Sequence, residues 1–227
     1  MRFPRTKCAL IVGAHPDDAV LGVGGTAALM RQNGWRVIIL TATRGGLGGP
    51  EDIREEEEKA SIASLSLELH QGTMQDGALD VQGCLHFLNK WVNYYEPAVI
   101  FTHAPEDTHQ DHITLSRASV IAARRCPCLL YYEGPSTREI QPVLQIDVSS
   151  VWSMKIAALH QYQSQLERLD LIRWAESVAH FRSWPDAWRA RVEVFQPERI
   201  SFDFVDASAS SSEENLITDL FLMSVAK

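Results

Sequence analysis

The sequence predicts an α/β protein, a single domain built on a Rossmann-like, open and mostly parallel sheet with helices on both faces. Three observations predict it: short continuous apolar runs, longer segments of helical periodicity between them, and a length of 227 residues that suits one domain. Parallel strands covered by helices on both faces read as continuous apolar runs. Alternation of such runs with helices therefore favours crossover connections within one sheet.

Apolar runs predict the strands of this sheet. They occupy residues 8–14, 37–42, 98–102 and 128–132, with a shorter strand at 70–73. The intervening helices are expected over residues 21–32, 53–67, 79–95 and 113–124. Beyond them the pattern is mainly helical from residue 151 to about 190, and one or two late strands follow in 191–205.

The C-terminal end differs in composition from the rest of the chain. Residues 206–214 are small, polar and serine-rich, which is typical of a flexible link, and residues 216–225 form a short apolar stretch. We therefore predict a domain over residues 1–205, followed by a polar linker and short tail over residues 206–227.

Composition restricts the expected location and partners. Because no apolar run approaches the roughly 18–20 residues that cross a bilayer, we expect no membrane anchor and no signal peptide. The four cysteines form neither a disulfide framework nor a paired zinc motif, which indicates free thiols in the cytoplasm. A net charge of −8 disfavours nucleic acid and anionic membranes, so a small-molecule partner fits better.

Two polar motifs follow predicted strands. Residues 15–18 (His-Pro-Asp-Asp) come directly after the first strand, and residues 102–112, with three histidines and three carboxylates, follow the strand at 98–102. Ligands of an open parallel sheet bind at the carboxyl ends of its strands. A histidine and an aspartate from the first motif, joined by one histidine from the second, would make a hydrolytic zinc site with an open position. The spacing alone leaves three candidates for that last ligand, His103, His109 and His112.

Together, residues 15–18 and 109–112 (His-Gln-Asp-His) resemble the motifs of the LmbE-like (PIG-L) family of zinc-dependent N-deacetylases. The similarity spans roughly residues 8–200 and includes Asp76-Gly77 and the segment from Lys155 to Gln165. The resemblance implies one Zn²⁺ per chain and an N-acetylated amino sugar as the substrate, from which acetate and a free amine are released. It also implies a homo-oligomer.

The resemblance assigns roles to single residues. The implied zinc ligands are His15, Asp18 and His112. Asp17 would take a proton from the metal-bound water, and His109 would stabilise or protonate the tetrahedral species. Asp111 would orient His109. Arg44 and Arg54 are candidates for substrate binding, although arginines near strand ends are as often structural ion-pair partners.

Alternative functions stay open at this point. Ala19 occupies a position that is commonly glutamate in the family, so a metal- or sugar-binding homologue with lost or altered catalysis is one alternative. An amidase acting on thiol conjugates of amino sugars is another. Residues 22–27 match the dinucleotide-binding pattern G-x-G-x-x-A only weakly, because they begin eight residues past the first predicted strand and no acidic residue closes the second.

Overall fold

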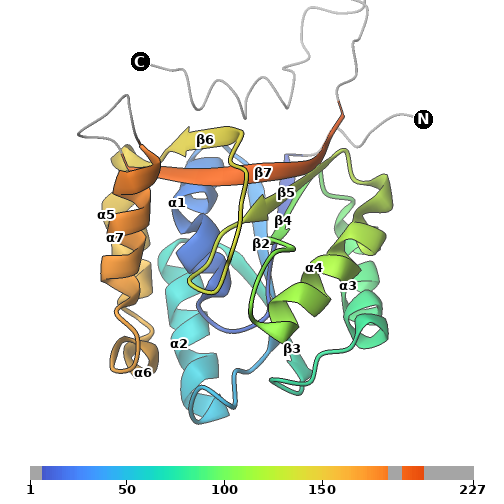
Figure 1. Cartoon of the computed structure of the whole chain (residues 1–227), viewed down its shortest axis with the longest axis horizontal. Coiled ribbons are helices and arrows are strands. Elements are labelled where there is room, and N and C mark those ends of the chain that lie inside the picture. Colours follow the sequence, from blue (N-terminus) through green and yellow to red (C-terminus); the bar gives the residue numbers. More distant parts are fainter. Residues whose placement is uncertain (1–6, 184–190, 202–227) are drawn as a thin grey trace, which may run out of the picture.

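The fold is a seven-stranded mixed sheet between two layers of helices, seen in a computed structural model that describes residues 7–183 and 191–201. The strand order is β3-β2-β1-β4-β5-β7-β6. The strands are β1 (Cys8–Gly13), β2 (Arg36–Thr43), β3 (Glu68–Met74), β4 (Val99–His103), β5 (Cys128–Tyr132), β6 (Leu144–Asp147) and β7 (Val192–Ile200). The first five strands are parallel, and β7 runs antiparallel to both β5 and β6 (Figure 1).

The helices are α1 (Asp18–Gln32), α2 (Glu51–Ser64), α3 (Val81–Tyr95), α4 (Gln110–Ala122), α5 (Trp152–Leu159), α6 (Gln163–Leu166) and α7 (Leu171–Arg182). Side chains of β1 alternate between two hydrophobic cores. Ala9 and Ile11 belong to the core shared with α1, α5 and α7, whereas Leu10 and Val12 belong to the core shared with α3 and α4 (Figure 1). Within the described ranges, no helix combines the length and apolarity needed to cross a membrane.

The predicted fold class is confirmed, and the differences lie in the C-terminal third. Residues 144–147 form β6, which the sequence does not predict, because four residues with alternating burial give no continuous apolar run. The helical region after residue 151 divides into α5, α6 and α7. One late strand, β7, ends at Ile200, and the predicted linker and tail lie outside the described residues.

The glycines of the G-x-G-x-x-A match lie inside α1 and not in a turn after β1. They allow close packing of this helix. A Cβ atom at Gly22 would collide with the Tyr132 ring, and one at Gly25 would lie 2.7 Å from Cβ of Val148. The structure therefore assigns these glycines to helix packing and not to a phosphate-binding turn.

A buried ion pair ties α1 to the C-terminal elements. Lys155 Nζ lies 2.6 Å from Glu193 Oε1 and donates to the carbonyl of Leu21 at 2.7 Å. The Glu193 carboxylate also accepts the backbone N–H groups of Gly25 and Thr26 at 2.8 and 2.7 Å. Both charged side chains are 4% exposed, so removing either would leave the other charge buried and unpaired.

We expect Lys155→Met to lower the free energy of unfolding by about 3–5 kcal/mol, because Glu193 would lose its only compensating charge among the described residues. Urea unfolding followed by circular dichroism measures this change. Lys59→Met is the matched control, since Lys59 makes comparable ion pairs with Glu55 and Glu56 on the surface of α2 and should leave stability close to that of the wild type. Equal effects of the two substitutions would contradict the prediction.

The order in which successive strands are added to the sheet reverses at β1. The strands β2 and β3 lie on one side of β1, and β4 and β5 lie on the other. A crevice forms where loops leave neighbouring parallel strands in opposite directions, at their carboxyl ends. The loops after β1 and β4 meet there, and they carry both sequence motifs.

Candidate metal centre

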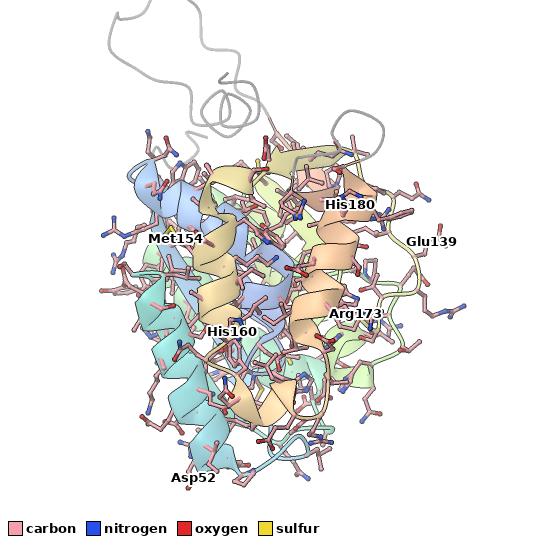
Figure 2. All side chains as sticks on the ribbon, turned by 90° about the vertical axis from the view of Figure 1, so that its left-hand side faces the viewer. Asp52, Glu139, Met154, His160, Arg173 and His180 are labelled. Carbon is pink, nitrogen blue, oxygen red and sulfur yellow. The ribbon has the colours of Figure 1, made fainter. Side chains whose placement is uncertain are left out.

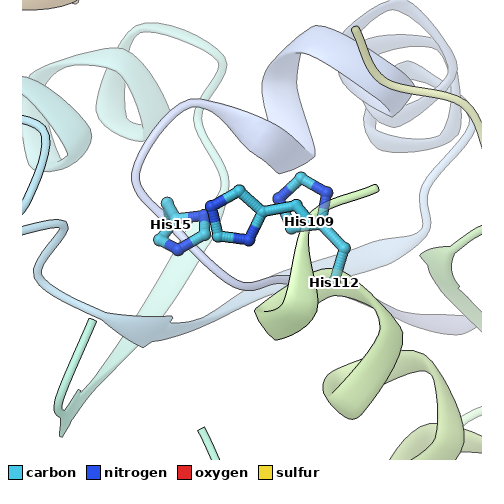
Figure 3. A group of neighbouring side chains, drawn as sticks. All are labelled: His15, His109 and His112. Carbon is cyan, nitrogen blue, oxygen red and sulfur yellow. The ribbon is translucent and has the colours of Figure 1, made fainter. Parts of the chain in front are cut away.

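Three histidines gather at this crevice (Figure 3). His15 follows β1, His109 is the N-cap of α4, and His112 lies in the first turn of that helix. Ring centroids are 4.7 Å apart for His15 and His109, 4.6 Å for His109 and His112, and 5.4 Å for His15 and His112. The structure thus brings together the two motifs, which are separated by more than 90 residues in the sequence.

Asp18 lies between two of these histidines. Its Oδ2 atom is 3.3 Å from Nδ1 of His15, and its Oδ1 atom is 3.5 Å from Nε2 of His112. Zinc binds nitrogen and oxygen at about 2.1 Å, so two donors of a tetrahedral site lie about 3.4 Å apart. Both Asp18 contacts have this separation, but they involve different oxygens of the carboxylate. Among the described residues, three donor sets have all their ligand atoms within 4.8 Å of one another: His15–His109–His112, Asp18–His103–His112 and His15–Asp76–Asp111. The cluster can therefore hold a metal ion, and Asp18 shares a donor set with His112.

The Asp18 carboxylate faces the histidines and does not cap α1. It accepts the backbone N–H of His15 at 2.7 Å, whereas the N-cap residue of α1 is Asp17, which makes no side-chain cap. Burial alone would raise the pKa of Asp18, but the charge of His112 and hydrogen bonds to histidine hold that pKa well below its ordinary value. Asp18 is therefore ionised, as a metal ligand must be.

His103 lies behind the other histidines. Its Nε2 atom is 3.4 Å from Asp18, but it accepts the backbone N–H of Ala14 at 3.1 Å, and its ring stacks on His112 at 3.9 Å. Burial, with the neighbouring charge of His112, lowers the pKa of His103 to about 4, so the ring is neutral. With its lone pair directed at a backbone donor, His103 is the least suited of the three candidate histidines to hold a metal.

Two carboxylates lie against the far side of the His15 ring. Nε2 of His15 is 3.3 Å from Asp111 and 3.0 Å from Asp76. Asp111 is expected to orient His109, but its carboxylate faces His15 instead, because the backbone N–H groups of Gly77 and Leu79 hold it there at 2.7 and 3.2 Å. A carboxylate on the second nitrogen of a metal-binding histidine fixes the orientation of the ring.

His112 has a similar support. Its Nδ1 atom lies 3.3 Å from Oδ2 of Asp107 and 3.2 Å from the hydroxyl of Ser136. Burial lowers the pKa of His112, but Asp18 and Asp107 outweigh that effect and raise it to about 9. The metal-free ring is therefore protonated at neutral pH, and Nε2 is the atom that faces Asp18.

The position of His109 determines which nitrogen carries its proton. Nδ1 accepts the backbone N–H of Asp111 at 3.3 Å, as an N-cap side chain does, so a neutral ring carries its proton on Nε2. The backbone N–H of His109 donates to Asp107 at 2.8 Å. Burial, followed by the charges of His112 and His15, lowers the pKa of His109.

Asp17 is buried beside the cluster, and Arg54 holds it. Arg54 Nη2 donates to Oδ2 of Asp17 at 3.0 Å and to the carbonyl of Pro16 at 2.7 Å, and Nη1 donates to the carbonyl of Gly45 at 2.9 Å. Burial, with the charge of Asp18, raises the pKa of Asp17 to about 7. Arg54 is 4% exposed, so its guanidinium supports two loops and offers little surface to the substrate it is expected to bind.

Arg44 lies at the surface. Its Nε atom is 3.1 Å from Glu55 of α2, and 41% of its side chain is exposed, so it is not part of the buried cluster. Asp76 and Asp107 are two residues of the cluster for which the sequence predicts no role. Both lie just beyond the carboxyl end of a parallel strand, β3 and β4 respectively, and that placement was the available signal.

Comparisons with known proteins point to one enzyme family. Residues 10–123 match the family described as GlcNAc-PI de-N-acetylase (PIG-L). The chain is 30% identical over 174 residues to an uncharacterized deacetylase, YaiS, of Escherichia coli K12, covering 70% of this chain and 92% of that protein.

Solved structures share the fold. The N,N'-diacetylchitobiose deacetylase of Pyrococcus horikoshii superimposes with a TM-score of 0.74 at 20% identity, over 84% of this chain and 83% of that one. The 4-carboxy-2-hydroxymuconate hydratase GalB of Pseudomonas putida KT2440 has a TM-score of 0.72 at 22% identity, over 88% of this chain and all of that one. Because the fold hosts both reactions, it does not by itself define the chemistry.

The family match and the deacetylase relative define the class: the chain belongs to the PIG-L (LmbE-like) family of de-N-acetylases. The family acts on acetylated sugar substrates.

Proposed function

We propose that this protein is a zinc-dependent hydrolase that removes an N-acetyl group from an amino-sugar-containing small molecule. The observation that carries the proposal is the position of Asp18 between His15 and His112, at donor separations of 3.3 and 3.5 Å and beside the buried Asp17 carboxylate. These three residues would hold the ion, one per chain. When bound, zinc supplies a Lewis acid that polarises the amide carbonyl and makes water a stronger acid.

Asp17 acts as the general base in this proposal. Arg54 occupies its Oδ2 atom, which leaves Oδ1 to take a proton from the attacking water. A base with a pKa near the working pH is the most effective, and the pKa of Asp17 is raised to about 7. The water oxygen attacks the acetyl carbonyl carbon as the proton leaves.

His109 acts on the tetrahedral species. Since Nδ1 accepts the backbone N–H of Asp111 at the start of α4, the neutral ring carries its proton on Nε2, and this N–H would donate a hydrogen bond to the oxyanion. Asp17, protonated during the attack, would pass its proton to the departing amine nitrogen as the C–N bond breaks. Water is added across the amide, and the products are acetate and a free amine. Asp76 and Asp111 keep His15 in place, and Asp107 does the same for His112.

The amino-sugar assignment draws on the GlcNAc-linked family description and on the diacetylchitobiose deacetylase of the same fold. We also propose that the enzyme is cytoplasmic and forms a homo-oligomer. Arg44, at the surface, is proposed to bind the substrate.

The first experiment measures metal content of the purified protein, together with acetate release from a panel of N-acetylglucosamine derivatives that includes N,N'-diacetylchitobiose. We expect about one zinc per chain and release that stops on chelation and returns with added zinc. Absence of bound metal after reconstitution would contradict the proposal.

Loss of catalysis is the second candidate, because Ala19 stands where the family commonly has glutamate. Ala19 is 2% exposed and packs within the hydrophobic core around α1, so its side chain is covered by neighbouring residues and not open to solvent. Stoichiometric zinc without acetate release from any N-acetyl sugar or thiol conjugate would favour a binding protein.

Metal affinity should rise with pH. The metal-free His112 has a pKa of about 9. Burial lowers the pKa of His15, but Asp111, Asp18 and Asp76 outweigh that effect and raise it well above its ordinary value. A histidine binds a metal in its neutral form, so at neutral pH the ion has to displace a proton from each ring. We expect the apparent zinc affinity to increase by about tenfold to 100-fold for each pH unit between about pH 6 and pH 8. Competition with a chelating dye, corrected for the dye's own protonation, measures it. An affinity that is flat over this range would show that no proton is released.

Removing Asp76 should weaken zinc binding without abolishing it. Asp76→Ala leaves Asp111 as the only carboxylate described on Nε2 of His15, and loss of such support typically costs about 10- to 100-fold in metal affinity. The same dye competition gives the dissociation constant. Asp52→Ala is the control, because Asp52 is exposed in the first turn of α2 (Figure 2) and belongs to none of the described donor sets. Unchanged affinity in Asp76→Ala would remove Asp76 from the metal centre.

A further inference from the structure

The backbone of Asp17 has an unusual conformation. Its φ angle is +99° and its ψ angle is −36°, a region that favours glycine. A non-glycine residue keeps such a conformation only where its surroundings impose it, and conformations of this kind concentrate at functional sites. The contacts that impose it on Asp17 are therefore of functional interest.

One turn of α2 holds Asp17 at two points. Arg54 donates to its carboxylate at 3.0 Å, and Glu58 accepts its backbone N–H on Oε2 at 3.3 Å. Residues four apart lie on the same face of a helix, so Arg54 and Glu58 approach the loop after β1 together. The side chain and the backbone of Asp17 are thus fixed by the same helix.

Glu58 is itself held from two directions. The hydroxyl of Thr41 donates to Oε1 at 2.6 Å, and the hydroxyl of Tyr162 donates to Oε2 at 2.5 Å. Glu58 is 1% exposed, and no lysine, arginine or histidine of the described residues forms an ion pair with it. A carboxylate buried without a cation is costly compared with an apolar side chain, which indicates a role beyond packing.

We propose that Glu58, secured by Tyr162 and Thr41, is a positioning residue that keeps the Asp17 backbone at positive φ and so directs the Asp17 carboxylate toward the substrate. This inference rests on the proposed function, because it takes Asp17 as the general base. Glu58 contacts none of the three proposed metal ligands through a described hydrogen bond, so it acts on turnover and not on metal binding.

Two substitutions of similar size test the proposal. Glu58→Gln keeps a carbonyl oxygen for the Asp17 N–H, and its amide can donate to Thr41, whose hydroxyl can rotate to accept. Glu58→Met fills the same space without an acceptor. We expect kcat to fall on the order of 100-fold in Glu58→Met, with KM and zinc content within about twofold of the wild type, and to stay within about threefold in Glu58→Gln.

A second readout does not depend on any substrate. Amide hydrogen exchange, followed by NMR, should be at least about tenfold faster for Asp17 in Glu58→Met than in Glu58→Gln, while the amides of β1 keep wild-type rates. Equal Asp17 exchange and equal kcat in the two variants would overturn the proposal. Unchanged turnover in Asp17→Asn would instead refute the proposed base, and the exchange comparison would still decide whether Glu58 fixes the backbone.

Should Glu58→Met fail to fold, Tyr162→Phe and Ser164→Ala give a gentler comparison. Each removes one hydroxyl donor from this segment to a carboxylate of α2, Tyr162 to Glu58 and Ser164 to Glu57 at 2.6 Å. We expect Tyr162→Phe to lower kcat about fivefold and to speed Asp17 exchange, because Glu58 can then rotate, whereas Ser164→Ala should change neither. The same result in both variants would overturn the proposal.

Discussion

Replacing His112 with alanine should remove the metal and the activity together. His112 offers Nε2 at 3.5 Å from Asp18, and alanine leaves only His15 and Asp18 of the three proposed ligands. Two ligands do not retain zinc against dialysis, so we expect zinc to fall from about one to below about 0.1 per chain and turnover to fall on the order of 1,000-fold or more. Elemental analysis by mass spectrometry and acetate release measure the two effects.

The control for this substitution is another histidine. His160 is exposed at the end of α5 (Figure 2), so His160→Ala should keep wild-type zinc and turnover. Circular dichroism would show whether His112→Ala is folded, which matters because His112 is 5% exposed. If His112→Ala is folded and retains full zinc, His112 is not a required ligand. His109, whose ring lies 4.6 Å from that of His112, would then be the proposed ligand in its place.

The sequence was sufficient for the central sheet because each buried parallel strand is a continuous apolar run. It failed for β6, whose side chains at Gln145 and Asp147 are exposed or half-buried and whose pairing depends entirely on β7, 45 or more residues later. Strand pairing between distant segments is decided by tertiary packing, which periodicity within one short segment does not contain.

The two metal motifs were predictable for a different reason. Strand ends of an open parallel sheet converge on one crevice, so residues 15–18 and 109–112 had to meet if both followed parallel strands. The direction of each side chain was not predictable. Asp111 faces His15 because the turn after β3 holds it there, and Asp76 reaches the same ring from that turn. No spacing within residues 109–112 carries that information.

The contact between the buried face of α2 and Asp17 was the hardest part of the site to predict from the sequence. Residues 51–58 include six carboxylates, a composition typical of a solvated helix face, yet Arg54 and Glu58 are buried and contact Asp17. Their spacing of four residues was the available signal, since it places both on one face of the helix. What the sequence lacks is the close approach of that face to the loop after β1.

Asp17→Asn should separate catalysis from metal binding. Asparagine has nearly the same shape and can accept the Arg54 hydrogen bond through its carbonyl oxygen, but it does not take up a proton near neutral pH. Loss of a general base costs about 10²- to 10⁴-fold in rate, so we expect kcat to fall by that factor while about one zinc per chain is retained. Steady-state acetate release, with zinc measured on the same samples, tests this.

A comparison with Asp18→Asn makes the test specific. Asp18 is adjacent in sequence and lies between His15 and His112, so its amide variant should lose zinc as well as turnover. Asp17→Asn and Asp18→Asn would then differ in metal content although both are inactive. If Asp17→Asn keeps normal turnover, the general base is another group. If it loses zinc, Asp17 acts through the metal centre, and its position beside Asp18 is structural.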